Sequence, residues 1–142
     1  MIIDHVGVVT KSMEQGIKLW TEKFGYRQKT NLVLNSRQQV NVIFLEKSGS
    51  IDIKLIEPAD ETSPVYRFAR QGGGLHHLCF KCEILTTQLL ALQEMGLRVI
   101  SGPEPGEAFE NENIAFVYAT QGLNIELIDT DKRAGRIGDC EL

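Results

Sequence analysis

Four residues at matched spacings are the candidates for chemistry in this chain. His5 and Lys54 are 49 residues apart in the sequence, and so are His77 and Glu126. Two neutral imidazoles and one carboxylate suit a divalent transition metal, and three protein ligands leave coordination positions open for water or for substrate oxygens. The pattern therefore predicts a metal site made of His5, His77 and Glu126, with Lys54 beside it.

The matched spacing belongs to an internal repeat with an offset of 72 residues. Residues 4–8 (DHVGV) correspond to 76–80 (HHLCF), and residues 53–57 (IKLIE) correspond to 125–129 (IELID). Such self-similarity is typical of two copies of one supersecondary unit, so the same order of strands and helices is expected in each copy.

The first copy, residues 1–57, reads as strand, helix and three strands. A β-branched run at 2–9 precedes a helix that Ser12 caps and Gly25 ends. Three strands are expected near 26–34, 39–46 and 51–57. The apolar face of the helix is expected to consist of Met13, Ile17, Trp20 and Phe24.

The second copy, residues 75–130, repeats this order. Its strands are expected near 75–81, 97–100, 113–120 and 124–130, with a helix after the first strand that Gly96 ends. The apolar face of that helix is expected to consist of Leu85, Leu89, Leu92 and Met95.

Three segments lie outside these regular elements. Residues 58–74 link the copies, with a short helix expected over 63–70. Residues 101–112 are rich in proline, glycine and glutamate and are expected to form a lid or a plain surface loop. Residues 131–142 form a polar tail that is expected to be disordered.

A βαβββ unit covers one face of its sheet with its helix and leaves the other face open. Two units must therefore share a cup, which predicts a single α+β domain over residues 1–130 in the form of a half-barrel. Strand alternation turns Ile53 and Leu55 to one face and Lys54 to the other. In the same way, Ile125 and Leu127 face one side and Glu126 the other. Lys54 and Glu126 are therefore expected to point into the cup.

These motifs resemble the vicinal oxygen chelate (glyoxalase/bleomycin resistance/dioxygenase) superfamily. The resemblance covers nearly all of residues 1–130 and rests on DHVG at 4–7, GLHHL at 74–78 and IEL at 125–127. KLIEP at 54–58 and the glycines at 72–74 are most similar to methylmalonyl-CoA epimerases and to lactoylglutathione lyase-like proteins. The resemblance implies a glyoxalase-like fold and four metal-ligand positions, which fall on His5, Lys54, His77 and Glu126.

Lys54 departs from the family pattern, because an ammonium has no lone pair to donate to a metal. Two outcomes are open. The remaining three residues hold a metal while Lys54 stabilises an enolate, or Lys54 pairs with Glu126 and replaces the metal. By family analogy, Glu126 is the candidate base for removing a proton next to a carbonyl.

The resemblance implies a lyase or an isomerase/epimerase that acts on a small carbonyl compound or an acyl thioester through an enolate-type intermediate. The alternatives are a metal-free small-molecule-binding protein of the bleomycin-resistance type and an extradiol-type dioxygenase with a site of two histidines and one glutamate. For the dioxygenase, His76 is the remaining histidine, but strand alternation turns it away from the cup. For an acyl-CoA substrate, Arg67, Arg70 and Lys81 are candidates for binding the phosphates.

Composition narrows the class of partner. The formal net charge of -4 argues against nucleic acid or an anionic membrane, and no apolar run approaches the ~20 residues that span a bilayer. Cys79, Cys82 and Cys140 are an odd number of thiols, which suits a reducing compartment. We therefore expect a cytoplasmic protein with a small-molecule substrate, and a homodimer because edge strands of half-barrels are open to pairing.

Overall fold

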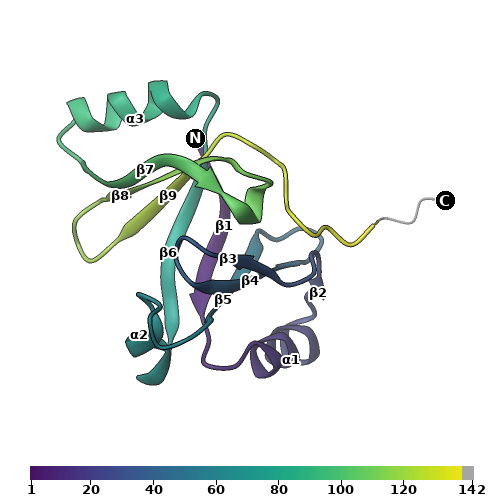
Figure 1. Cartoon of the computed structure of the whole chain (residues 1–142). Coiled ribbons are helices and arrows are strands. Elements are labelled where there is room, and N and C mark those ends of the chain that lie inside the picture. The colour runs from purple at the N-terminus through teal and green to yellow at the C-terminus, as the bar shows by residue number, and fades with distance from the viewer. Residues whose placement is uncertain (139–142) are drawn as a thin grey trace.

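The computed structural model describes residues 1–138 of the 142-residue chain. Figure 1 shows the elements in chain order. They are β1 (Ile2–Val9), α1 (Met13–Phe24), β2 (Arg27–Gln28), β3 (Val33–Asn35), β4 (Val40–Glu46), β5 (Asp52–Pro58), α2 (Tyr66–Arg70), β6 (Gly74–Lys81), α3 (Leu85–Glu94), β7 (Arg98–Gly106), the 3₁₀ helix η1 (Glu107–Phe109), β8 (Glu112–Tyr118) and β9 (Asn124–Ile128).

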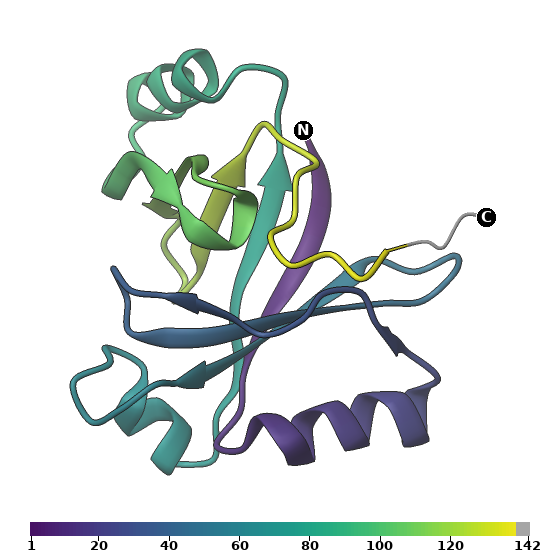
Figure 2. The ribbon, with the colours of Figure 1, turned by 45° about the vertical axis from the view of Figure 1, so that its right-hand side comes forward.

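All the strands belong to one mixed sheet that contains both copies of the repeat. Its order is β2-β4-β5-β1-β6-β9-β8-β7, with β3 paired to β4. In each copy the last strand runs parallel to the first, as β5 with β1 and β9 with β6, and the antiparallel pair of β1 and β6 joins the copies. Figure 2 shows these two central strands side by side. The α+β fold of two βαβββ modules around a cup is confirmed.

The two modules anchor their helices by the same contact. The Glu57 carboxylate at the end of β5 accepts a hydrogen bond from the Met13 backbone N–H at 2.8 Å, and Asp129 after β9 accepts one from the Leu85 N–H at 2.8 Å. Both pairs are related by the 72-residue offset. A carboxylate at a helix N-terminus satisfies a free N–H and interacts favourably with the helix dipole, so each last strand positions the helix of its own module.

The predicted helix faces are largely confirmed. Ser12 caps α1 by accepting a hydrogen bond from the Gln15 N–H at 3.2 Å, and Gly25 ends the helix in the left-handed conformation at φ 74°. The prediction is wrong for the last residue of each apolar helix face, because Phe24 is 51% exposed and Met95 is 70% exposed. Both lie at the C-terminal end of their helix, beyond the part that packs on the sheet.

Three expectations about irregular segments are wrong. The strand expected over 26–34 is split into β2 and β3, and the segment between them meets the C-terminal tail. Residues 101–112 form no plain loop, because β7 continues to Gly106 and η1 buries Phe109 in the cup. The tail is ordered up to residue 138, while residues 139–142 lie outside the described part.

The tail crosses the cup as a strap that touches both modules, which Figure 2 shows in yellow. We call residues 131–138 the C-terminal strap. The Ala134 N–H donates to the Ala108 carbonyl in η1, and the Ile137 N–H donates to the Lys29 carbonyl in the first module, both at 2.9 Å. The strap therefore links η1 of the second module to the Lys29 segment of the first.

Among residues 1–138, no helix is long and apolar enough to cross a membrane. The sheet ends at β2 and β7, so these edges are where a second chain would pair. The expected homodimer stays a prediction.

Removing the carboxylate that holds α3 should weaken the second module. We expect Asp129→Ala to lower the free energy of unfolding by about 1 kcal/mol, because α3 has no other side-chain cap. Urea unfolding measures the difference. Glu61→Ala, in an exposed turn, is the control and should leave stability unchanged. Equal stability of both variants would contradict the capping role of Asp129.

Candidate functional site

The four residues singled out by the repeat meet at one carboxylate. His5 on β1 and His77 on β6 place their Nε2 atoms 2.9 and 3.0 Å from Glu126 Oε1 on β9. Lys54 on β5 places its Nζ 3.5 Å from the other oxygen, Oε2. All four side chains are buried, with Glu126 fully so. Their role in binding or catalysis remains a prediction.

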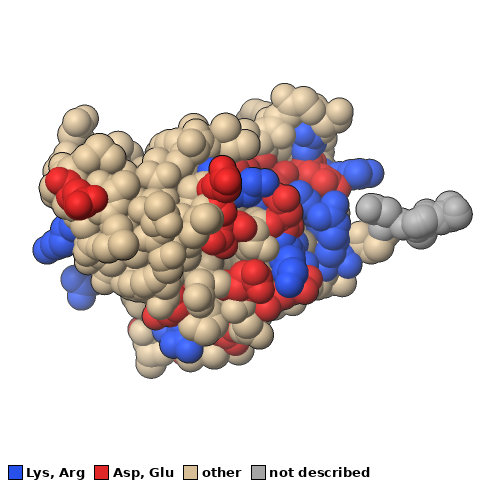
Figure 3. Space-filling view, turned by 90° about the horizontal axis from the view of Figure 1, so that it is seen from above, with Lys and Arg blue, Asp and Glu red and all other residues tan. Residues whose placement is uncertain are grey.

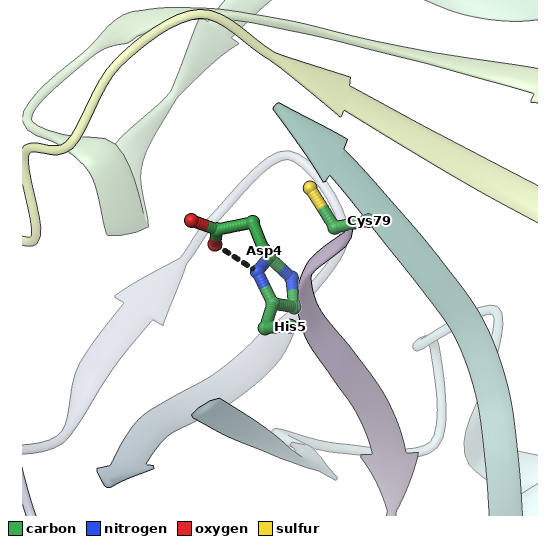
Figure 4. A group of neighbouring side chains, drawn as sticks. All are labelled: Asp4, His5 and Cys79. Carbon is green, nitrogen blue, oxygen red and sulfur yellow. Dashed lines mark hydrogen bonds and ion pairs between the residues drawn. The ribbon is translucent and has the colours of Figure 1, made fainter. Parts of the chain in front are cut away.

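Two β-bulges add a second layer to the site. The register between β1 and β6 slips at Asp4 and again at His76, so each is an extra residue in its strand. Asp4 Oδ2 accepts a hydrogen bond from His5 Nδ1 at 2.7 Å, which Figure 4 shows, and His76 Nδ1 lies 2.8 Å from His77 Nδ1. In both modules the residue before the histidine thus orients its ring and leaves Nε2 facing Glu126.

Sequence alternation missed this arrangement. A regular strand would turn His76 away from His77, but the bulge brings the two rings into contact. The available signal was the repeat, which places Asp4 and His76 at corresponding positions.

Gly7 makes room for the second histidine. It lies opposite His77 across the central strand pair, and a Cβ on Gly7 would stand 2.2 Å from the imidazole Cε1. The corresponding residue of the second module, Cys79, is paired with His5 and lies beside it in Figure 4. Burial raises the pKa of the Cys79 thiol strongly, so the thiol stays neutral.

The site holds Glu126 as a carboxylate. Burial raises the pKa of Glu126, but the charge of Lys54 and the hydrogen bonds from both histidines outweigh it and leave the pKa well below its ordinary value. Burial also raises the pKa of Asp4, and the His5 hydrogen bond and the Arg133 charge reverse that effect, leaving the pKa lowered. The site therefore contains two carboxylates.

The donors fit a metal ion when their protons are counted. Both ring nitrogens of His5 face carboxylate oxygens, which can only accept hydrogen bonds. A neutral His5 that donates from Nδ1 to Asp4 turns its Nε2 lone pair toward the negative Glu126. A cation between them removes that repulsion, and the donor atoms of His5, His77 and Glu126 all lie within 4.8 Å of one another.

Arg133 of the C-terminal strap is a site residue that sequence reasoning missed. It is 4% exposed, forms an ion pair with Asp4, and lies over the rings of Phe44 and Phe109 at 4.4 and 5.1 Å. Its Nε has no hydrogen-bond partner among the described residues. A polar tail gives no sequence signal for such burial.

Aromatic rings from both modules line the cup. Phe44 and Phe116 are equivalent in the repeat and contact His5 and His77 edge-on, at centroid distances of 5.2 and 5.4 Å. Phe109 from η1 lies 5.2 Å from Lys54 Nζ. These rings exclude water, which strengthens the electrostatic interactions of the buried charges.

A pocket of about 200 Å³ reaches the edge of the site. His76 and Phe116, which both contact His77, form part of its wall, and Gln38, Ser101 and Asn124 supply polar groups. A pocket with apolar walls and a few polar groups suits a small organic ligand.

Of the basic residues expected to bind phosphates, none is among the residues that line this pocket, and α2 begins directly after the lining residues Pro64 and Val65. Arg67 and Arg70 lie on α2, before the start of β6, while Lys81 is at the end of β6 and pairs with Asp131. Figure 3 shows charged side chains of both signs gathered on one part of the surface seen from above.

Comparisons with known proteins agree with the fold. The sequence profile of the Glyoxalase/Bleomycin resistance protein/Dioxygenase superfamily matches residues 4–116. An uncharacterized protein from Bacillus subtilis (strain 168) is 32% identical over 133 residues, covering 89% of this chain and 91% of that protein.

Epimerases are among the similar proteins. The ethylmalonyl-CoA/methylmalonyl-CoA epimerase of Cereibacter sphaeroides is 31% identical over 81 residues, which span 56% of this chain and 60% of that enzyme. The crystal structure of methylmalonyl-CoA epimerase from Mycobacterium tuberculosis is similar with a TM-score of 0.79 and 25% identity, covering 89% of this chain and 86% of that one.

Filling the space beside His77 should disturb the site and the fold together. We expect Gly7→Ala to lower the free energy of unfolding by about 1–3 kcal/mol, because the added methyl group overlaps a buried ring between paired strands. Urea unfolding measures the loss. Gly138→Ala, where a Cβ meets open space, is the matched control. Equal stability of the two variants would show that the ring is not fixed where we describe it.

Acid should destabilise the metal-free protein before its carboxylates titrate. Burial lowers the pKa of His77 to about 4 from 6.5, against the opposing effect of Glu126. Between these values the unfolded chain binds the extra proton, so stability is present above pH 6.5 and falls as the pH decreases. We expect a loss of about 1.5 kcal/mol between pH 6.5 and pH 5.

Urea unfolding at a series of pH values, in the presence of a chelator, measures this slope. His77→Gln should flatten it in part, with the rest coming from His76, whose pKa is also lowered by burial. An identical slope in both proteins would rule out His77 as the source.

Proposed function

Because this chain belongs to the glyoxalase/bleomycin resistance protein/dioxygenase superfamily, we propose that it is an isomerase of the epimerase kind that acts on an acyl-CoA thioester. The reaction would remove a proton from the carbon next to the thioester carbonyl and deliver a proton to the opposite face of the resulting enolate. The named relatives act on ethylmalonyl-CoA and methylmalonyl-CoA, which supports this substrate class.

The observation that carries the proposal is the buried Lys54 at the position of a family metal ligand. Its Nζ is 3.5 Å from Glu126 and lies 5.2 and 6.0 Å from the ring centroids of Phe109 and Phe44, so this buried ammonium is held away from bulk water. A charge placed in this way stabilises a developing oxyanion more strongly than it would in water. We assign to Lys54 the stabilisation of the enolate oxygen.

We further propose that His5, His77 and Glu126 hold a divalent metal ion. When bound, such an ion would supply Lewis-acid polarisation of the thioester carbonyl. Asp4 and His76 would orient the two imidazoles, since each contacts the ring nitrogen that faces away from Glu126.

Glu126 is the base that the family resemblance implies. Its lowered pKa makes it a weak base, so the proton it removes must first be made acidic by the positive charges around the enolate oxygen. The aromatic walls would keep water away from that intermediate. In this proposal Glu126 removes the proton and Lys54 stabilises the oxyanion.

A small-molecule-binding protein is the second candidate. The observation that favours it is that the four central side chains are buried and that Lys54 pairs with Glu126, which leaves these groups little exposed to a substrate. A protein of this kind would bind its ligand in the pocket beside His76 and leave it chemically unchanged.

Hydrogen exchange separates the two candidates. We expect the metal-loaded protein to exchange the α-proton of methylmalonyl-CoA for deuterium in D₂O, as followed by NMR or mass spectrometry. Lys54→Met should slow the exchange at least ~100-fold, because the oxyanion loses its cation. Lys11→Met, at an exposed position outside the site, is the control. Binding of the thioester without exchange would contradict the isomerase and support the binding protein.

A further inference from the structure

We infer that this site binds its divalent cation strongly only together with an anionic ligand, because Lys54 and Arg133 already balance the negative charges of the cup. The inference rests on the proposed metal site of His5, His77 and Glu126. It adds a dependence that the ligand set alone does not predict.

Buried charged side chains of both signs lie in the cup. Among residues 1–138, Glu126 is the one buried carboxylate, whereas the buried cations are Lys54 and Arg133. Asp4, which is partly exposed, pairs with Arg133. Two negative and two positive side chains therefore meet in the cup, and its net charge is zero when both histidines are neutral.

Asp52 is a further carboxylate close to Arg133. Asp52 at the rim pairs with Lys29 at 2.7 Å and lies 3.9 Å from Arg133. Its charge is therefore already matched. The cup thus has no unmatched carboxylate, among the residues described, that would offset a further cation.

A divalent ion would bring two positive charges into a buried site that already holds two cations, and burying unbalanced charge is costly. An oxyanion bound beside Lys54 would offset part of this excess. Arg133 is a second candidate donor, since its buried Nε–H has no hydrogen-bond partner within residues 1–138. The matching ligand is a carboxylate or an enolate oxygen on a small acyl group.

Two substitutions at position 54 separate the effect of removing the positive charge from the effect of adding a metal ligand. Lys54→Met removes the cation and adds no donor, whereas Lys54→Gln removes it and adds a carbonyl oxygen. We expect Lys54→Met to bind Co²⁺ at least ~10-fold more tightly than the unmodified protein, and Lys54→Gln at least ~100-fold more tightly. Arg133 remains in both variants, so the strap stays anchored to Asp4.

The experiment titrates Co²⁺ into chelator-treated protein and follows the visible absorption of the bound ion. Each titration is run with sodium propionate and with sodium perchlorate at the same ionic strength. Propionate should tighten Co²⁺ binding to the unmodified protein at least ~10-fold and should have less than half that effect on Lys54→Gln. His77→Gln is the control for ions bound elsewhere and should show neither response.

Three results would overturn the inference. The first is equal Co²⁺ affinity in propionate and perchlorate for the unmodified protein. The second is a Lys54→Met variant that binds no more tightly while its circular dichroism shows that it is folded. The third is no Co²⁺ bound by any variant, Lys54→Gln included, which would remove the metal proposal as well. The first two concern Co²⁺ affinity alone, whereas failure of the unmodified, metal-loaded protein to exchange the α-proton would contradict the proposed function, so the two failures are distinguishable.

Discussion

A carboxylate with no exposure to solvent is the constraint on which this structure depends. Removing an ionised group from water is costly unless charges and hydrogen bonds replace the lost hydration. Glu126 obtains these partners from three other strands, through His5 on β1, His77 on β6 and Lys54 on β5. The contacts that stabilise the buried Glu126 carboxylate therefore also hold the two modules together.

Much of this arrangement could be predicted from the sequence, because the repeat carries it. The equal spacing of His5 to Lys54 and of His77 to Glu126 fixes which positions converge once two βαβββ units share a cup. Alternation then gives the direction of Lys54 and Glu126, since β5 and β9 are regular strands. The helix caps at Ser12 and Gly25 follow from short-range chemistry.

What could not be predicted depends on contacts between distant segments. A bulge is a property of two paired strands, so a single strand sequence does not reveal that Asp4 and His76 share a face with the histidines that follow them. The same holds for the burial of Arg133, which requires η1 and the Lys29 segment to receive the strap. Composition alone classifies such a tail as polar and exposed.

The strap and the aromatic rings give the site its low-dielectric surroundings. Phe44, Phe109 and Phe116 come from different parts of the chain, yet each contacts one of the central polar residues. Water exclusion increases both the benefit of a matched charge and the cost of an unmatched one. Hence the identity of residue 54 has consequences for the whole cup.

The difference between Lys54 and Glu126 at equivalent positions also limits how such a site can arise. Two identical half-length chains that paired about a twofold axis would place the same residue at both positions, either two glutamates or two lysines. Like charges would then face each other in the interior, at 3.5 Å in the present geometry. Joining the halves in one polypeptide lets each position mutate independently, so a carboxylate can face an ammonium. Covalent linkage of the modules thus allows this asymmetric centre without a second kind of chain.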